Sequence, residues 1–225
     1  MNLSLNHSMS ALRVTLVAPC LALFLACAKT EAKLIASKTS LALIQCVPDT
    51  LAGFDTPNAA FAAYTDALNR ADFCKAIAFY ESPAQLEAAL SGFRMLVMLA
   101  GGQSPEQMEY QKRFIELCNH YTLNYGEQSA FVGLFLSLLN DKDWQADIPD
   151  VRAVVEKDPA SFYADVMRRI QSVSSSATVT IAPHLSDLTF DAEIAMAKAT
   201  RSDGRVIPVS FRQTAQGWML ALLDD

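Results

Sequence analysis

The spacing of hydrophobic residues changes twice along the chain. Residues 14–26 form a continuous apolar run without a charge. From residue 57 to residue 171 apolar residues recur three and four positions apart, which predicts amphipathic helices. After the polar stretch 172–176 the spacing falls to two, which is typical of β-strands. Helices followed by an antiparallel meander indicate the α+β class.

Helix starts are marked by residues that can cap a helix. A Thr, Ser or Asp stands directly before a proline, which suits the first helical position, at Thr56, Ser82, Ser104 and Asp158. Asp72 is placed to cap a further short helix, and another helix is expected at about residues 129–139. Two acidic pairs between these helices, Asp141/Asp143 and Asp147/Asp150, are expected to be solvated loop charges or caps.

Four strands are predicted, at residues 178–182, 192–200, 205–213 and 217–223. Asp203-Gly204, between the second and the third, is a strong hairpin signal. The last strand alternates Trp218 and Leu220 on one face with Met219 and Ala221 on the other, so both of its faces are apolar. Antiparallel sheets usually leave one face in water, so we expect something to cover the second face. We favour the helices of residues 83–171 over another subunit.

The N-terminal residues have the organisation of an export signal. Residues 1–13 carry one fixed charge, Arg13, and precede the apolar run 14–26. A helix of that length reaches only about 20 Å, whereas a bilayer core is about 30 Å thick, so it is too short to span. The sequence predicts a signal peptide at residues 1–26, an anchor and tether at residues 27–54, and one α+β domain at residues 55–225.

The end of the apolar run resembles the lipobox of bacterial lipoproteins, in which a small residue precedes the lipidated cysteine. Ala26 and Cys27 within Phe24-Leu25-Ala26-Cys27-Ala28 carry this resemblance. It implies that Cys27 becomes the mature N-terminus, bears a diacylglycerol and an acyl chain such as palmitate, and anchors the chain stably to a membrane. Ala28 then implies the outer membrane if the cell has two. The alternative is ordinary secretion, with cleavage before Lys29.

The domain itself resembles the nuclear transport factor two-like (cystatin-like) cone fold. The resemblance is carried by the helix–Asn69-x-x-Asp72–helix start and by a closing hairpin whose last strand begins Gly217-Trp218. It implies N-terminal helices packed on a cone-like sheet of about four strands, with residues 83–171 as a large helical insert. It also implies an inward-facing pocket, for which the candidate residues are Tyr64, His184, Glu193 and Trp218.

Composition excludes several classes of function. The 225 residues carry a net charge of −6, the wrong sign for a protein that grips nucleic acid through its phosphates. No catalytic motif, phosphate-binding glycine loop or metal-ligand spacing is present, and Cys118-Asn119-His120 places its pair on different sides of a helix. We therefore predict no catalytic residues, no metal and no cofactor.

After export, Cys46, Cys74 and Cys118 would meet an oxidising compartment, where they can form at most one internal disulfide. Cys46–Cys74 is favoured, and three free thiols are an equal alternative. Together these features predict a membrane-anchored cell-envelope lipoprotein, facing the periplasm or the exterior, that acts as a non-enzymatic binding or interaction module, as monomer or homodimer. The alternatives are an assembly factor that docks a partner protein through the helical insert, and a small-molecule enzyme that uses the cone pocket.

Overall fold

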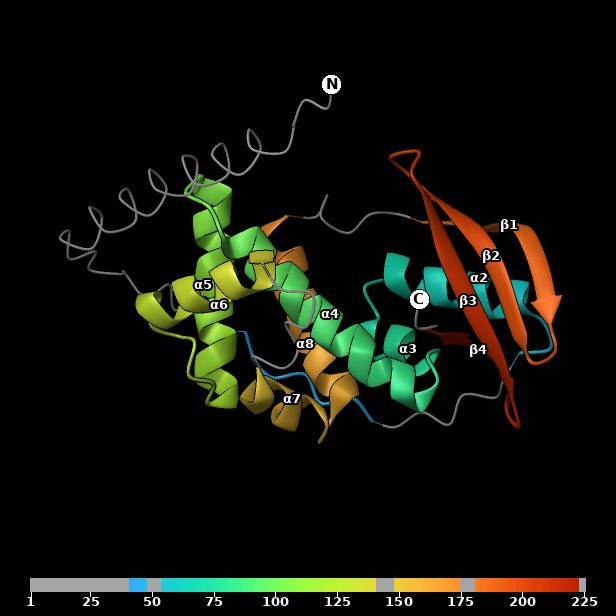
Figure 1. The fold of residues 1–225 in the computed structure, drawn as a ribbon, viewed down its shortest axis with the longest axis horizontal. Coiled ribbons are helices and arrows are strands. Elements are labelled where there is room, and N and C mark those ends of the chain that lie inside the picture. Colours follow the sequence, from blue (N-terminus) through green and yellow to red (C-terminus); the bar gives the residue numbers. More distant parts are fainter. Residues whose placement is uncertain (1–40, 48–53, 141–147, 175–180, 223–225) are drawn as a thin grey trace, which may run out of the picture. The chain divides into compact units, whose positions relative to one another are not determined.

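The structure, a computed structural model, describes residues 41–47, 54–140, 148–174 and 181–222. The predicted signal peptide, Cys27 and most of the predicted tether lie outside these described residues. In the described part helices precede a curled antiparallel sheet that forms a half-barrel, so the predicted α+β class is confirmed (Figure 1). The helices are α2 (Pro57–Asn69), α3 (Phe73–Ala78), α4 (Ser82–Ala100), α5 (Pro105–Tyr121), α6 (Gln128–Asn140), α7 (Pro149–Val155) and α8 (Pro159–Val173).

Most predicted caps are in place. The side chains of Thr56, Asp72 and Asp158 each accept a hydrogen bond from a backbone N–H in the first turn of their helix. Ser104 forms a capping box with Gln107. The exception is α4, where Glu81 rather than Ser82 is the N-cap and makes no side-chain cap.

Helix α7 was not predicted. The expectation that Asp150 lies in a loop between helices is wrong, because this residue belongs to the first turn of α7. The helix has seven residues and buries Val151 and Val155, and its N-cap residue Ile148 is buried as well. So short a helix offers too few apolar positions to reveal a helical spacing, and its stability comes from packing against the rest of the core.

The sheet is an antiparallel meander in the order β1 (Ile181–Asp191), β2 (Ile194–Arg201), β3 (Val206–Thr214) and β4 (Gly217–Ala221). The predicted hairpin at Asp203-Gly204 is confirmed, with Gly204 at a φ of 81°. β1 extends nine residues beyond the predicted end at residue 182. It is an edge strand with two register shifts, and these irregularities break the alternation by which strands are recognised.

The described residues bury two apolar clusters. The helical core gathers side chains from α3 to α8, with Phe93, Phe114 and Phe162 among the largest. The half-barrel core lies between α2 and the concave face of the sheet and includes Phe61 and Phe211. Helix α3 belongs to both cores, because it places Ile77 in the helical core and Ala76 in the half-barrel core. The two cores therefore meet along α3.

The second face of the sheet is not covered by the helical insert. Among the described helices, α2 is the one that packs substantially on the strands, and it lies on the concave face (Figure 1). On β2 the alanines that face α2 are buried, whereas Met196, on the opposite face, is 54% exposed. The expectation that the insert covers this second face is therefore wrong for the described strands.

Candidate functional site

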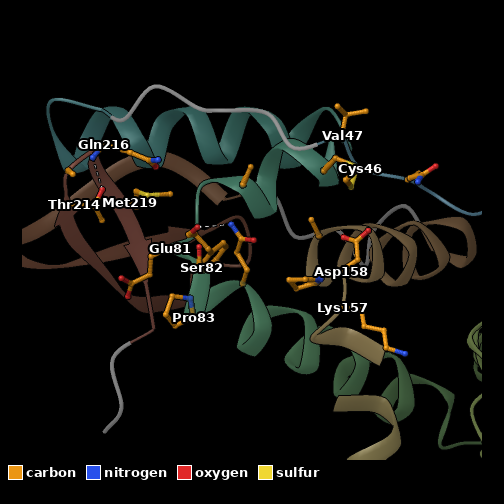
Figure 2. A pocket seen from close by; sticks show the side chains of 18 residues that line it. Cys46, Val47, Glu81, Ser82, Pro83, Lys157, Asp158, Thr214, Gln216 and Met219 are labelled. Atoms are coloured by element: carbon orange, nitrogen blue, oxygen red, sulfur yellow. Dashed lines mark hydrogen bonds between the residues drawn. A yellow bond between two sulfur atoms is a disulfide. The ribbon is translucent and has the colours of Figure 1, made fainter. Parts of the chain in front are cut away.

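A cleft of about 910 Å³ opens where the helical core and the half-barrel core adjoin. This volume lies within the range of ligand pockets, which occur preferentially between structural units. Five parts of the chain line it: residues 45–47, helix α3, residues 80–85, residues 157–160, and the end of the β3–β4 hairpin. Figure 2 shows Glu81, Ser82 and Pro83 between a wall that carries Thr214, Gln216 and Met219 and another that carries Lys157 and Asp158.

The floor of the cleft is the connection between α3 and α4, and backbone hydrogen bonds fix it to the sheet. Leu220 of β4 donates its N–H to the carbonyl of Phe79 (2.9 Å), and Glu81 donates its N–H to the carbonyl of Leu220 (3.0 Å). The carboxylate of Glu81 is also ion-paired with Arg212 of β3 (3.4 Å). Gln85 closes this connection by donating its side-chain amide to the carbonyl of Tyr80 (3.0 Å).

The wall formed by the β3–β4 hairpin is shaped by its turn. Thr214 donates its hydroxyl to the carbonyl of Gly217 (2.9 Å) and accepts a hydrogen bond from the N–H of Gln216 (3.1 Å). Gly217 has a φ of 115°, a conformation that favours glycine. The side chain of Gln216 is exposed at the rim.

The opposite wall comes from the start of α8 and from residues 41–47, which we call the 41–47 segment. Asp158 is committed to capping, since its carboxylate accepts the N–H of Ser161 (3.0 Å). The hydroxyl of Ser161 in turn accepts the N–H of Cys46 (2.9 Å). Lys157 is exposed and contributes a positive charge to this side of the cleft.

A disulfide between Cys46 and Cys74 attaches the 41–47 segment to α3, with the two Cα atoms 5.4 Å apart. The pair that the sequence favoured is thus the pair that the structure joins, and both half-buried cysteines line the cleft. Cys118 is free and buried in the helical core, and burial raises the pKa of its thiol to about 12.

Three tyrosines meet beneath the cleft floor. Tyr80 donates its hydroxyl to that of Tyr64 (3.1 Å), and Tyr163 of α8 lies against Tyr64. Burial raises the pKa of all three hydroxyls, so they stay neutral at physiological pH and act as hydrogen-bonding groups. This cluster connects α2, the cleft floor and α8.

The four residues predicted for a cone pocket do not come together. Tyr64 and Trp218 lie in the half-barrel core, whose interior is filled by α2 and by side chains such as Phe61 and Phe211. His184 and Glu193 are exposed, the first near the start of β1 and the second in the turn after its end. The sequence does not predict the cleft as a site, because its residues come from separate parts of the chain and match no motif. The prolines at the starts of α4 and α8 are the nearest signal, and they indicate helix starts rather than part of a binding site.

A buried ionic network lies apart from the cleft and joins α5 to α8. Arg169, 1% exposed, is ion-paired with Asp165 (3.2 Å) and with Glu116 (3.3 Å). Burial raises the pKa of Asp165, and the adjacent Arg169 offsets this only in part. Asp165 is fully buried, and its second carboxylate oxygen has no hydrogen-bond partner among the described residues. The network holds α5 against α8, and no motif in the sequence predicts it.

Within the described residues, no three or more His, Cys, Asp and Glu side chains gather as a metal site would need. None of the helices in the described part combines the length and the apolar character needed to cross a membrane. No family model matches the chain, and no curated protein or solved structure is significantly similar to it.

Proposed function

We propose that the protein is a membrane-anchored cell-envelope lipoprotein that acts as a non-enzymatic binding module, and that its binding site is the cleft between the two cores. The observation that carries the proposal is the cleft itself: about 910 Å³, with a floor fixed to the sheet and walls from four other parts of the chain. A site assembled in this way can recognise one ligand with both cores at once.

The lining supports binding. Val47, Pro83 and Met219 offer apolar surface, while Lys157 and the amide of Gln216 offer polar contacts. A lining that mixes apolar and polar groups suits a small molecule or a short segment, because apolar contact supplies affinity and the polar groups fix orientation.

The disulfide and the N-terminal sequence support export. Disulfides persist in oxidising compartments such as the periplasm and are rare in the reducing cytosol. The lipobox-like stretch ending at Cys27 supplies the anchor in this proposal. The order of helices followed by a half-barrel sheet supports a place among the nuclear transport factor two-like folds, with α4 to α8 as an insert that such folds do not need.

The anchoring is tested by mass spectrometry of the mature N-terminus isolated from the producing bacterium. We expect a chain that begins at Cys27 with a mass increase equal to a diacylglycerol plus an acyl group, and loss of this species in a Cys27→Ser variant. An unmodified chain that begins at Lys29 would show secretion without an anchor. A full chain that keeps Met1 would overturn export altogether.

The binding is tested by placing a photo-crosslinking phenylalanine analogue at Gln216, on the cleft rim, in the full chain within its own cell envelope. We expect a discrete adduct that is lost when Ala215→Trp fills the cleft from the same turn. The matched control carries the analogue at Asn58, an exposed residue of α2 outside the cleft. Equal adducts from Gln216 and Asn58, or none from either, would overturn the cleft as the binding site.

A further inference from the structure

We propose that the Cys46–Cys74 disulfide regulates the cleft: its reduction by a dithiol releases the 41–47 segment from the helical core and removes one wall of the cleft. This inference rests on the proposed function, because it concerns access to the same site. The geometry that points to it is that the disulfide lines the cleft and joins a segment without regular structure to helix α3, which belongs to both cores.

Without the disulfide, little holds the 41–47 segment. The segment has no helix or strand, and among the described residues one hydrogen bond of good length attaches it, from the N–H of Cys46 to Ser161 (2.9 Å). A second, from Arg168 to the carbonyl of Ala42, is 3.5 Å long and exposed. Ile44 is only half-buried against the helical core, and Val47 is 82% exposed. The covalent bond is therefore the main attachment of this segment.

The other end of the disulfide does not depend on it. Helix α3 buries Phe73 and Ile77 in the helical core and Ala76 in the half-barrel core, and Asp72 caps its first turn. Both cores thus keep their contacts with α3 when the bond to Cys46 is broken. Reduction is expected to change the cleft wall and leave the rest of the fold in place.

The chemistry is thiol–disulfide exchange with a dithiol reductant. A thiolate of the dithiol attacks one of the two sulfurs, forms a mixed disulfide and expels the other cysteine as a thiolate, which takes up a proton. The second thiol of the dithiol then closes its own disulfide, so two electrons and two protons pass to Cys46 and Cys74. Cys118 does not compete for either sulfur, because it is buried in the helical core and its thiol stays protonated.

The test is hydrogen–deuterium exchange of the full chain, oxidised and after treatment with dithiothreitol, followed by mass spectrometry. We expect exchange at the Cys46 amide, the one N–H of residues 41–47 that is hydrogen-bonded within the described part of the chain, to rise at least tenfold on reduction, and exchange in α4 and α8 to change less than twofold. The Cys46→Ser/Cys74→Ser variant should behave like the reduced protein under oxidising conditions. The matched control, Cys118→Ser, should behave like the oxidised wild type. Unchanged exchange at the Cys46 amide, or global unfolding of the reduced chain, would overturn the inference.

The regulation and the binding function can fail separately. If residues 41–47 are released but the adduct at Gln216 forms with equal yield in wild type and Cys46→Ser/Cys74→Ser, the disulfide does not regulate the cleft. If no adduct forms in either redox state, binding in the cleft is overturned together with its regulation, even where the exchange result holds. A yield that changes at least threefold between the two states supports both.

Discussion

The hydroxyl of Tyr80 donates a hydrogen bond to the hydroxyl of Tyr64 over 3.1 Å, and this pair joins the cleft floor to helix α2 of the half-barrel core. The two rings also meet edge to face, with their centroids 5.5 Å apart. Since Tyr163 of α8 lies against Tyr64, the contact extends to the helical core. The polar cluster therefore fixes the two cores relative to each other beneath the cleft.

Tyr64→Phe keeps the ring and removes the hydroxyl, which leaves the Tyr80 hydroxyl without this partner. We expect the free energy of unfolding, measured by urea denaturation, to fall by about 1–3 kcal/mol. The control is Tyr121→Phe, a half-buried tyrosine whose hydroxyl makes no hydrogen bond with the described residues. The double variant Tyr64→Phe/Tyr80→Phe should lose less than the sum of the two single variants, because they remove the same bond. An equal loss in Tyr64→Phe and Tyr121→Phe would contradict the role of this hydrogen bond.

The buried carboxyl of Asp165 predicts a pH dependence of stability. Burial raises its pKa in the folded protein above the unfolded value of about 3.9. The folded state then binds the proton more tightly than the unfolded state does. The stabilisation from Asp165 is therefore complete below the unfolded pKa and is lost as the pH rises through the raised folded pKa.

Asp165→Asn removes this titration, so the free energy of unfolding of the variant should decline less than that of the wild type from about pH 4 upward. The chain offers a matched control in Asp66→Asn. Asp66 and Arg70 form the same kind of ion pair, four residues apart on a helix, but their side chains are 54% and 74% exposed. Urea titrations between pH 3 and pH 8 measure both variants. The prediction is wrong if Asp165→Asn and Asp66→Asn follow the same pH profile.

Local chemistry made much of the fold predictable. Thr56 and Ser104 predict helix starts. The first N–H groups of a helix have no hydrogen-bond partner within the helix, and the side-chain oxygen of the capping residue accepts a hydrogen bond from one of them, three residues further along the chain. Asp203-Gly204 predicts a hairpin because glycine adopts the positive φ of the tight turn without steric strain. These signals act over a few residues, so one sequence is enough to detect them.

The cleft could not be predicted, because its signal is spread over the chain. Gln216, Ser82 and Lys157 are ordinary surface residue types. They line the same cleft because α3 packs in both cores and so brings distant parts of the chain together. The candidate pocket residues Tyr64 and Trp218 illustrate the opposite case. Their aromatic side chains face inward as expected, but α2 packs so closely on the sheet that they fill the half-barrel core.

Pro208 lies in β3 two residues beyond Ser210, the partner of Ala221 at the end of β4. The backbone N–H groups of Trp218 and Leu220 point away from β3, toward Phe54 and Phe79, so Met219 and Ala221 are the residues whose backbone pairs with β3. Their partners are Arg212 and Ser210, and alternation along the strand directs the backbone of Pro208 to the same side. A proline cannot donate a hydrogen bond there, which protects this end of β3, where no described residue of β4 pairs with it, against another strand.

Pro208→Val restores an N–H at this edge, next to Val206, which is 56% exposed. We expect the variant to self-associate with rising concentration in sedimentation velocity, while the stability of the monomer changes by no more than about 0.5 kcal/mol. Thr200→Val is the matched control, because Thr200 pairs with Val206 across the sheet and the change adds apolar surface without a new backbone donor. If Thr200→Val associates as strongly as Pro208→Val, the exposed apolar surface and not the missing N–H controls association, and the protective role of Pro208 is wrong.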